Sequence, residues 1–300
     1  MILEVIGPPF LLVAVGYLLG RLGGVPAHPF AAVSFWILSP ALIFETLRTA
    51  QLPAREAGLV ALFVLAHYTL MFLLSLPLGR ALFPHDADAR RATGLLLTFG
   101  NCGNLGLPLL LFAYGPRAVD VGGIFLATNT VLLATLGVGI ATWQGRWEPR
   151  ALLKGVFGVP WPYAVALAVL MRTFNAWPPL LARASGLLVQ AAIPVFLLLL
   201  GLELAAARLS PLAKPALLLA LARLGLASLL SWLLVPFFAQ EPILRRALVL
   251  EGSVPSAVNA YILAAQYRRR PELAATALLL STLLSLGTLS LTLFLLARFG

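Results

Sequence analysis

Long apolar runs, separated by short polar connections, fill almost the whole of this sequence. A helix needs roughly 20 apolar residues to cross a bilayer, and ten segments approach or exceed that length. The predicted spans cover residues 2–22, 29–47, 57–83, 92–114, 119–143, 161–171 (extended toward 152), 180–207, 215–238, 244–267 and 273–297. The second span is expected to break at Ser39-Pro40. The pattern predicts an all-α integral membrane protein with ten transmembrane helices.

The fourth span contains residues that interrupt a membrane helix. Its centre reads Gly100-Asn101-Cys102-Gly103-Asn104-Leu105-Gly106-Leu107-Pro108. Each interior glycine costs a helix about 1 kcal/mol and a proline about 3 kcal/mol, so we expect the helix to break near mid-membrane. Unpaired backbone at that depth is tolerated only when protein buries it or it lines a wet cavity. Such a break is typical of a transporter binding site.

The ninth span carries a second interruption, Glu251-Gly252-Ser253-Val254-Pro255-Ser256-Ala257-Val258-Asn259. A shift of 155 positions, without gaps, places the first region on the second. The coinciding residues are Arg90-Arg91-Ala92 with Arg245-Arg246-Ala247, Leu95 with Leu250, and Asn104 with Asn259. The alternative is a pair of unrelated proline kinks.

A repeat of five spans must thread the membrane in opposite senses in its two copies, because five is odd. The sequence therefore predicts two inverted five-helix repeats, residues 1–148 and 149–300, within one membrane domain. The two broken helices are expected to meet near the midplane.

Each break creates a half-helix N-terminus inside the membrane, and such ends favour anions. We expect the half-helices to start near Leu105 and Ala257, with Asn104 and Ser256 as N-caps. Asn101, Asn104 and Asn259 either contact a carboxylate or only satisfy the broken backbone, and both interpretations stay open.

Three ionisable residues lie inside spans, where they are costly and must face the bundle interior or water. They are His67, Arg223 and Glu251. Our hypothesis pairs Arg223 with Glu251, or with bound substrate. Glu251 is then either a proton-coupling group or half of a static ion pair. Glu45 and Glu203 lie near span ends, where we expect interfacial positions.

Three glycines on the first span, Gly16, Gly20 and Gly24, recur every four residues. This spacing predicts close helix packing. Packing within one chain is favoured over a contact between two chains.

The composition agrees with a membrane protein, with 61% hydrophobic and 11% charged residues and a mean hydropathy of +0.97. The net charge of +10 is explained by arginines in the connections rather than by nucleic-acid binding. The odd-numbered connections are the more basic, so we expect them in the cytoplasm. The sequence thus predicts a multi-pass protein of the cell (inner) membrane with both termini outside the cytoplasm. Cys102 is the single cysteine, so no intrachain disulfide forms, and no cofactor or metal site is indicated.

The motif Asn101-x-x-Asn104-x-Gly106-x-Pro108, together with Pro255-Ser256-Ala257-Val258-Asn259-Ala260-Tyr261, resembles the auxin efflux carrier family in its short prokaryotic form. The resemblance implies crossed broken helices, similar to those of sodium/proton antiporters. It also implies a scaffold of spans one, two, six and seven, a transport part of spans three to five and eight to ten, an elevator-like movement and a homodimer.

The substrates implied by the resemblance are organic anions: indole-3-acetate in plants, malate or malonate in bacterial relatives. It carries crossover roles onto Asn104, Pro108, Pro255 and Asn259. The sequence therefore predicts a secondary transporter of small carboxylates, with protons as a candidate coupling ion.

Two other functions are alternatives to a carboxylate transporter. One is a sodium-coupled organic-anion symporter of the bile-acid type on the same fold. The other is an intramembrane enzyme, which would need paired aspartates or a Ser/His dyad. The aspartates, Asp86, Asp88 and Asp120, all lie in connections, and His67 has no obvious partner in the sequence.

Overall fold

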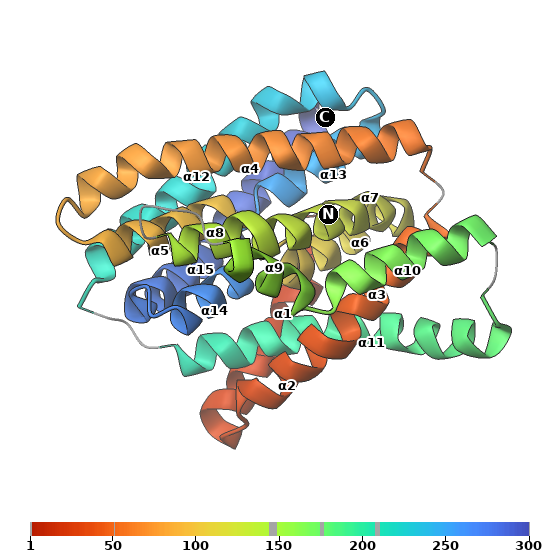
Figure 1. Ribbon diagram of the computed structural model, residues 1–300, viewed down its shortest axis with the longest axis horizontal. Coiled ribbons are helices and arrows are strands. Elements are labelled where there is room, and N and C mark those ends of the chain that lie inside the picture. The colour runs from red at the N-terminus through yellow and green to blue at the C-terminus, as the bar shows by residue number, and fades with distance from the viewer. Residues whose placement is uncertain (1, 51, 144–148, 175–176, 208–210, 300) are drawn as a thin grey trace.

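The computed structural model describes residues 2–50, 52–143, 149–174, 177–207 and 211–299, and in this part of the chain helices joined by short connections make up nearly all of the structure (Figure 1). The α-helices are α1 (Ile2–Gly23), α2 (Ala27–Val33), α3 (Ser39–Thr49), α4 (Ala54–Leu82), α5 (Ala87–Thr98), α6 (Leu107–Tyr114), α7 (Pro116–Leu132), α8 (Val138–Thr142), α9 (Pro149–Phe157), α10 (Trp161–Phe174), α11 (Pro179–Ala206), α12 (Ala213–Phe238), α13 (Pro242–Gly252), α14 (Val258–Gln266) and α15 (Pro271–Phe299). Three π-helical turns join neighbours: η1 (Ser34–Leu38), η2 (Cys102–Gly106) and η3 (Leu133–Gly137).

Seven helices of the described chain are long and apolar enough to cross a membrane, at residues 4–23, 27–49, 54–82, 116–142, 179–206, 213–238 and 271–299. This confirms the prediction of an integral, multi-pass membrane protein. The three other expected spans are each divided into two shorter helices: α5 and α6, α9 and α10, and α13 and α14. The total of ten spans and the repeat stay predictions, and the expected boundary at residue 148 falls in 144–148, outside the described residues.

The prediction that the second span breaks at Ser39-Pro40 is wrong. The helix continues from Ala27 to Thr49 through the π-helical turn η1, which ends just before Ser39. Proline lacks an N–H and its ring collides with the carbonyl four residues earlier. A wider π-helical turn directly before Pro40 accommodates the ring without ending the helix.

The sixth span is interrupted where none was predicted. Gly158, Val159 and Pro160 separate α9 from α10. The extension toward residue 152 exists, but as a helix of its own.

The glycines of α1 pack against α11 of the same chain. A Cβ on Gly16 would lie 2.2 Å from the carbonyl oxygen of Leu198, and one on Gly20 would lie 2.7 Å from the Cβ of Ala205. Gly201 of α11 returns the contact, since its Cβ would lie 2.0 Å from the carbonyl oxygen of Val13. The prediction of close packing within the chain is confirmed for Gly16 and Gly20. It is wrong for Gly24, which follows the end of α1 and where a Cβ would meet nothing within 4 Å. In Figure 1, α11 and α4 run along opposite sides of the molecule.

Ion pairs join the start of α5 to the connection that follows α14. Arg269 contacts Asp88 at 2.7 Å, and Arg270 donates to Asp86 at 2.6 Å. Partial burial alone would raise the pKa of Asp86, but hydrogen bonds from the backbone of Ala89 and from Arg270 outweigh it and lower that pKa. These pairs hold the outer ends of the two interrupted spans together.

The α1–α11 contact predicts opposite effects for two glycine substitutions in one helix. Alanine normally stabilises a helix relative to glycine by up to about 1 kcal/mol. Gly7→Ala should therefore be neutral or stabilising, since a Cβ there meets nothing within 4 Å. Gly16→Ala should lower stability by roughly 1–3 kcal/mol because main-chain atoms must move. Melting temperatures in detergent measure both, and equal values would contradict the described packing.

Candidate functional site

The two interrupted spans are joined to each other by their backbones. The Asn101 N–H donates to the Pro255 carbonyl at 2.8 Å, and the Ala257 N–H donates to the Phe99 carbonyl at 2.9 Å. Gly100 and Ser256 form an antiparallel bridge between these bonds. We call residues 99–101 and 254–257, with this pairing, the junction. It satisfies backbone groups that neither broken helix satisfies alone.

Arg223 of α12 binds the carbonyl ends of both broken helices. Nη1 donates to Leu97 at 2.7 Å and to Thr98 at 3.1 Å, at the end of α5. Nε and Nη2 each donate to Val254 at 3.1 Å, and Nη2 also lies 3.4 Å from the Gly252 carbonyl at the end of α13. The side chain is fully buried.

The planar guanidinium has five donors in a fixed fork, and all of them face carbonyl oxygens. The C-terminal end of a helix carries about half a negative charge. One positive charge therefore compensates two helix ends at the same point.

Gly100 makes room for this arginine. A Cβ on Gly100 would lie 2.4 Å from Nη2 of Arg223 and 2.8 Å from a methyl group of Val254. The sequence singled out this glycine only as a helix breaker. Its second role, to let the Arg223 side chain approach the backbone at Gly100, depends on the tertiary arrangement.

The predicted N-caps are wrong. The first half-helix resumes at Cys102, so Asn101 is its N-cap and Asn104 lies inside η2. Its π-helical start allows the Asn101 carbonyl to accept from both Leu105 and Gly106, at 3.2 and 3.1 Å. The second half-helix begins at Val258 with Ala257 as N-cap and no side-chain cap.

Ser256 instead links the two breaks. Its hydroxyl donates to the Leu96 carbonyl of α5 at 3.0 Å, while its N–H donates to the Ser281 hydroxyl at 3.3 Å. The residue is therefore part of the junction, but by a contact that the local sequence did not indicate.

Glu251 does not pair with Arg223 in this structure, contrary to one form of our hypothesis. Its carboxyl group lies against Gly106, where a Cβ would be 2.2 Å from Oε2, and against Gly122 of α7, where a Cβ would be 3.0 Å from Oε1. The side chain is fully buried. Within the described part of the chain, neither carboxyl oxygen has a hydrogen-bond partner.

His67 does have a neighbour that the sequence did not suggest. Its Nε2 lies 3.1 Å from the Ala227 carbonyl and 3.2 Å from the Ser231 hydroxyl. Arg223, Ala227 and Ser231 follow one another at intervals of four on α12, so they line one helix face. This spacing could have indicated from the sequence that Ser231 lies on the same helix face as Arg223. Nδ1 of His67 is buried and has no partner within the described residues.

The amide side chains near the junction differ in exposure. Asn101 is buried, and its Nδ2 has no hydrogen-bond partner in the described chain. Asn104 and Asn259 are partly exposed. Pro108 is buried one turn into the first half-helix, and Pro255 accepts the Asn101 N–H. The structure thus brings Asn101, Pro255 and Ser256 into direct backbone contact, with Gly106 against Glu251.

A cavity of about 490 Å³ lies between α1, α3 and α11 on one side and α6 and α7 on the other. The residues that line it include Glu45, Thr46, Leu111, Asp120 and Gln190. Glu45 is ion-paired with Arg48 and also accepts from Ser185 of α11 at 3.1 Å. It is therefore engaged within the bundle rather than free at a helix end.

A cleft between helices, with two half-helix ends in the bundle interior, is the architecture of a membrane transport protein. The family model described as "Membrane transport protein" matches residues 1–149 and 150–294. The chain belongs to this family, the auxin efflux carriers, as the motifs had indicated. It is a transporter, not an enzyme.

Relatives are similar along nearly the whole chain. A protein of Rhizobium meliloti (strain 1021) named "Putative malonate transporter" is 28% identical over 300 residues, which cover 96% of this chain and 93% of the relative. An "Uncharacterized transporter" of Methanothermobacter thermautotrophicus is 28% identical over 288 residues, 94% of each chain. Another, of Methanocaldococcus jannaschii, is 25% identical over 296 residues, again 94% of each chain.

The contacts of Arg223 predict that lysine cannot replace it. Arg223→Lys keeps the charge but loses the fork, so buried carbonyls of α5 or α13 lose their donors. Each unsatisfied buried group costs roughly 1–3 kcal/mol, and the melting temperature in detergent should fall. Arg117→Lys, at an exposed position with a loose 3.6 Å ion pair, is the control and should change little. Equal melting temperatures for both variants would contradict a structural role for the fork.

Proposed function

We propose that this protein is a secondary active transporter of small organic anions, with dicarboxylates such as malonate as the substrate class. The observation that carries the proposal is the junction. It places the starts of two half-helices, at Cys102 and Val258, on either side of one short backbone pairing. Helix N-termini inside a membrane offer unpaired N–H groups and partial positive charge to an anion.

Charge near the junction supports an anionic substrate. The cation Arg223 is fully occupied by carbonyl oxygens, so it balances the negative helix ends and leaves the positive ends uncompensated. Asn104 and Asn259 are partly exposed, and their side-chain amides form no hydrogen bond within the described residues. Their amides are therefore available to orient a carboxylate. The name of the Rhizobium relative supports malonate as the first substrate to test.

The cavity of about 490 Å³ supports a moving boundary between two parts of the molecule. It separates helices of the proposed scaffold (α1, α3, α11) from helices of the proposed transport part (α6, α7). At this boundary Gly123 of α7 lies against Thr46 of α3, where a Cβ would lie 2.0 Å from a methyl group. The proposed elevator-type movement takes place along this boundary.

The two-repeat organisation is part of the proposal. The family model matches the chain in two pieces, residues 1–149 and 150–294, which supports the division at 148/149. The bridged residues, Gly100 and Ser256, are within one position of equivalence under the predicted shift. We further propose a homodimer in the inner membrane with both termini outside the cytoplasm.

Glu251 is the proposed proton carrier. A buried carboxyl without any hydrogen-bond donor is costly when ionised, so a change in its surroundings during transport would change its proton affinity. Its position against Gly106, at the start of a half-helix, couples it to the proposed anion site. A sodium-coupled cycle is the alternative, and a dependence of uptake on sodium instead of on pH would favour it.

The first prediction of this proposal concerns Asn104. In proteoliposomes, the wild-type protein should take up malonate with saturation. Asn104→Ala should raise KM about tenfold or more, because a hydrogen bond to a charged group contributes about 1.5–3 kcal/mol. Gln240→Ala, which removes an amide outside the bundle, is the control and should leave KM unchanged. Saturable malonate uptake with the same KM in Asn104→Ala would contradict the proposed site.

The second prediction concerns Glu251. Glu251→Gln keeps the shape of the side chain but cannot release a proton, so an imposed pH gradient should no longer accelerate uptake. Glu203→Gln is the matched control, since Glu203 also has a buried carboxyl oxygen without a partner in the described chain but lies on α11. It should keep the response to the gradient. A normal response in Glu251→Gln would exclude the coupling role.

A further inference from the structure

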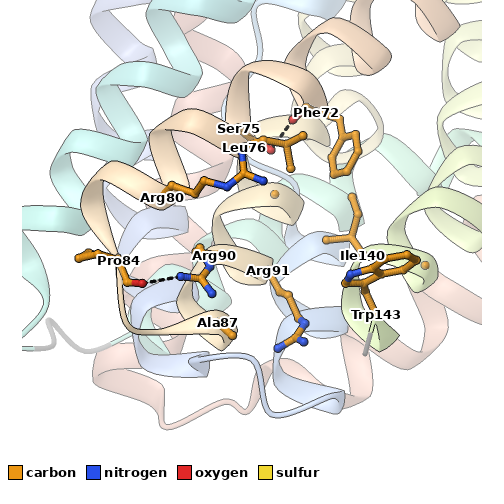
Figure 2. A pocket seen from close by; sticks show the side chains of 12 residues that line it. Phe72, Ser75, Leu76, Arg80, Pro84, Ala87, Arg90, Arg91, Ile140 and Trp143 are labelled. Atoms are coloured by element: carbon orange, nitrogen blue, oxygen red, sulfur yellow. Dashed lines mark hydrogen bonds between the residues drawn. The ribbon is translucent and has the colours of Figure 1, made fainter. Parts of the chain in front are cut away.

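A second cavity, of about 770 Å³, lies away from the junction. It is formed by the second half of α4, the first half of α5 and α8. Figure 2 shows three arginines, Arg80, Arg90 and Arg91, along one side, with Phe72 and Trp143 across from them. No residue described as lining this cavity is acidic.

The arginines differ in how strongly they are engaged. Arg90 donates to the carbonyl of Phe83 at 3.1 Å and to that of Pro84 at 2.8 Å, which fixes its position. Figure 2 shows the second of these bonds. Arg91 is ion-paired with Asp88 at 2.8 Å. Arg80 is exposed and, within the described residues, forms neither a hydrogen bond nor an ion pair.

The nearby carboxylates do not neutralise this cluster. Asp88 also contacts Arg269, at 2.7 Å, and Asp86 is paired with Arg270. Asp88 is therefore shared between Arg91 and Arg269, and Asp86 is paired with Arg270. The cavity keeps an excess of positive charge.

The apolar wall of the cavity continues into a face that lipid would cover. Leu76 lines the cavity and is 37% exposed, and Leu73, one turn earlier on α4, is 50% exposed. Trp143, at the rim, is 39% exposed. A tryptophan beside arginines, where an apolar helix face ends, is typical of the interface between headgroups and acyl chains.

We propose that this cavity binds an anionic phospholipid of the leaflet that the sequence predicts to be cytoplasmic. The lipid phosphate lies among the guanidinium groups of Arg80, Arg90 and Arg91, and one acyl chain follows Leu76 and Leu73 along α4. Basic pockets between membrane helices on the cytoplasmic side bind anionic headgroups in this way. A dicarboxylate alone would leave the apolar wall unused.

The site would connect lipid composition to the junction. Arg90 and Arg91 belong to α5, whose other end supplies the carbonyls bound by Arg223. A lipid held at one end of α5 restrains the half-helix that carries the junction at its other end.

Native mass spectrometry of the detergent-solubilised protein, titrated with phosphatidylglycerol or phosphatidylcholine, tests the proposal. We expect one tightly held phosphatidylglycerol and weaker binding of phosphatidylcholine. Arg80→Gln should weaken phosphatidylglycerol binding about fivefold, the factor that one arginine contributes near an anionic surface. Arg21→Gln is the matched control, because Arg21 is exposed on the same predicted side at the end of α1, and it should bind like the wild type.

Competition with soluble anions distinguishes a lipid from a small anion. Neither glycerol phosphate nor malonate at millimolar concentration should displace the bound phosphatidylglycerol. Displacement by either one, equal affinity for both lipids, or equal weakening by Arg80→Gln and Arg21→Gln would overturn the proposal. Malonate uptake by Arg80→Gln in phosphatidylcholine liposomes should equal that of the wild type, since the variant leaves the junction intact.

Discussion

The binding of one arginine to the carbonyl ends of two broken helices is the interaction on which the rest of the structure depends. A membrane interior has no water to hydrogen-bond with open backbone groups, so two breaks at one place need donors from within the protein. Arg223 supplies five of them, and its charge matches the dipoles of α5 and α13. The direct bonds between residues 99–101 and 255–257 satisfy much of what remains.

This arrangement also separates charge in a useful way. The negative helix ends face the buried arginine, while the positive starts of the other half-helices have no ion-pair partner within the part of the chain that the structure describes. The carboxyl group of Glu251 is buried against Gly106, near the first of those starts, without a hydrogen bond in the described chain. An anion site beside an unpaired carboxyl group is the basis of the proposed coupling of anion movement to protons.

Glycine determines how closely the parts approach one another. Gly100 admits the guanidinium, Gly106 and Gly122 admit the carboxyl group of Glu251, and Gly16 and Gly201 bring α1 and α11 into backbone contact. The contact of Gly100 lets Arg223 reach the junction, those of Gly106 and Gly122 enclose Glu251, and those of Gly16 and Gly201 fix α1 against α11. Between them, Gly123 of α7 allows Thr46 of α3 to pack directly against its main chain.

The sequence by itself determined the class of protein, the positions of the long helices and the two interrupted stretches, because these depend on apolar length and on glycine and proline, which act locally. The family followed from the motifs around Asn104 and Asn259. Only the tertiary structure decided which groups the buried polar side chains bind. Arg223 could be paired with Glu251 on charge alone, yet the structure gives it to carbonyl oxygens, because open backbone in the interior requires donors more than the carboxyl group does. Ser256 likewise bonds across to Leu96 instead of capping its own helix. Such choices depend on contacts between separate helices, some of them more than a hundred positions apart in the chain, and no local pattern encodes them.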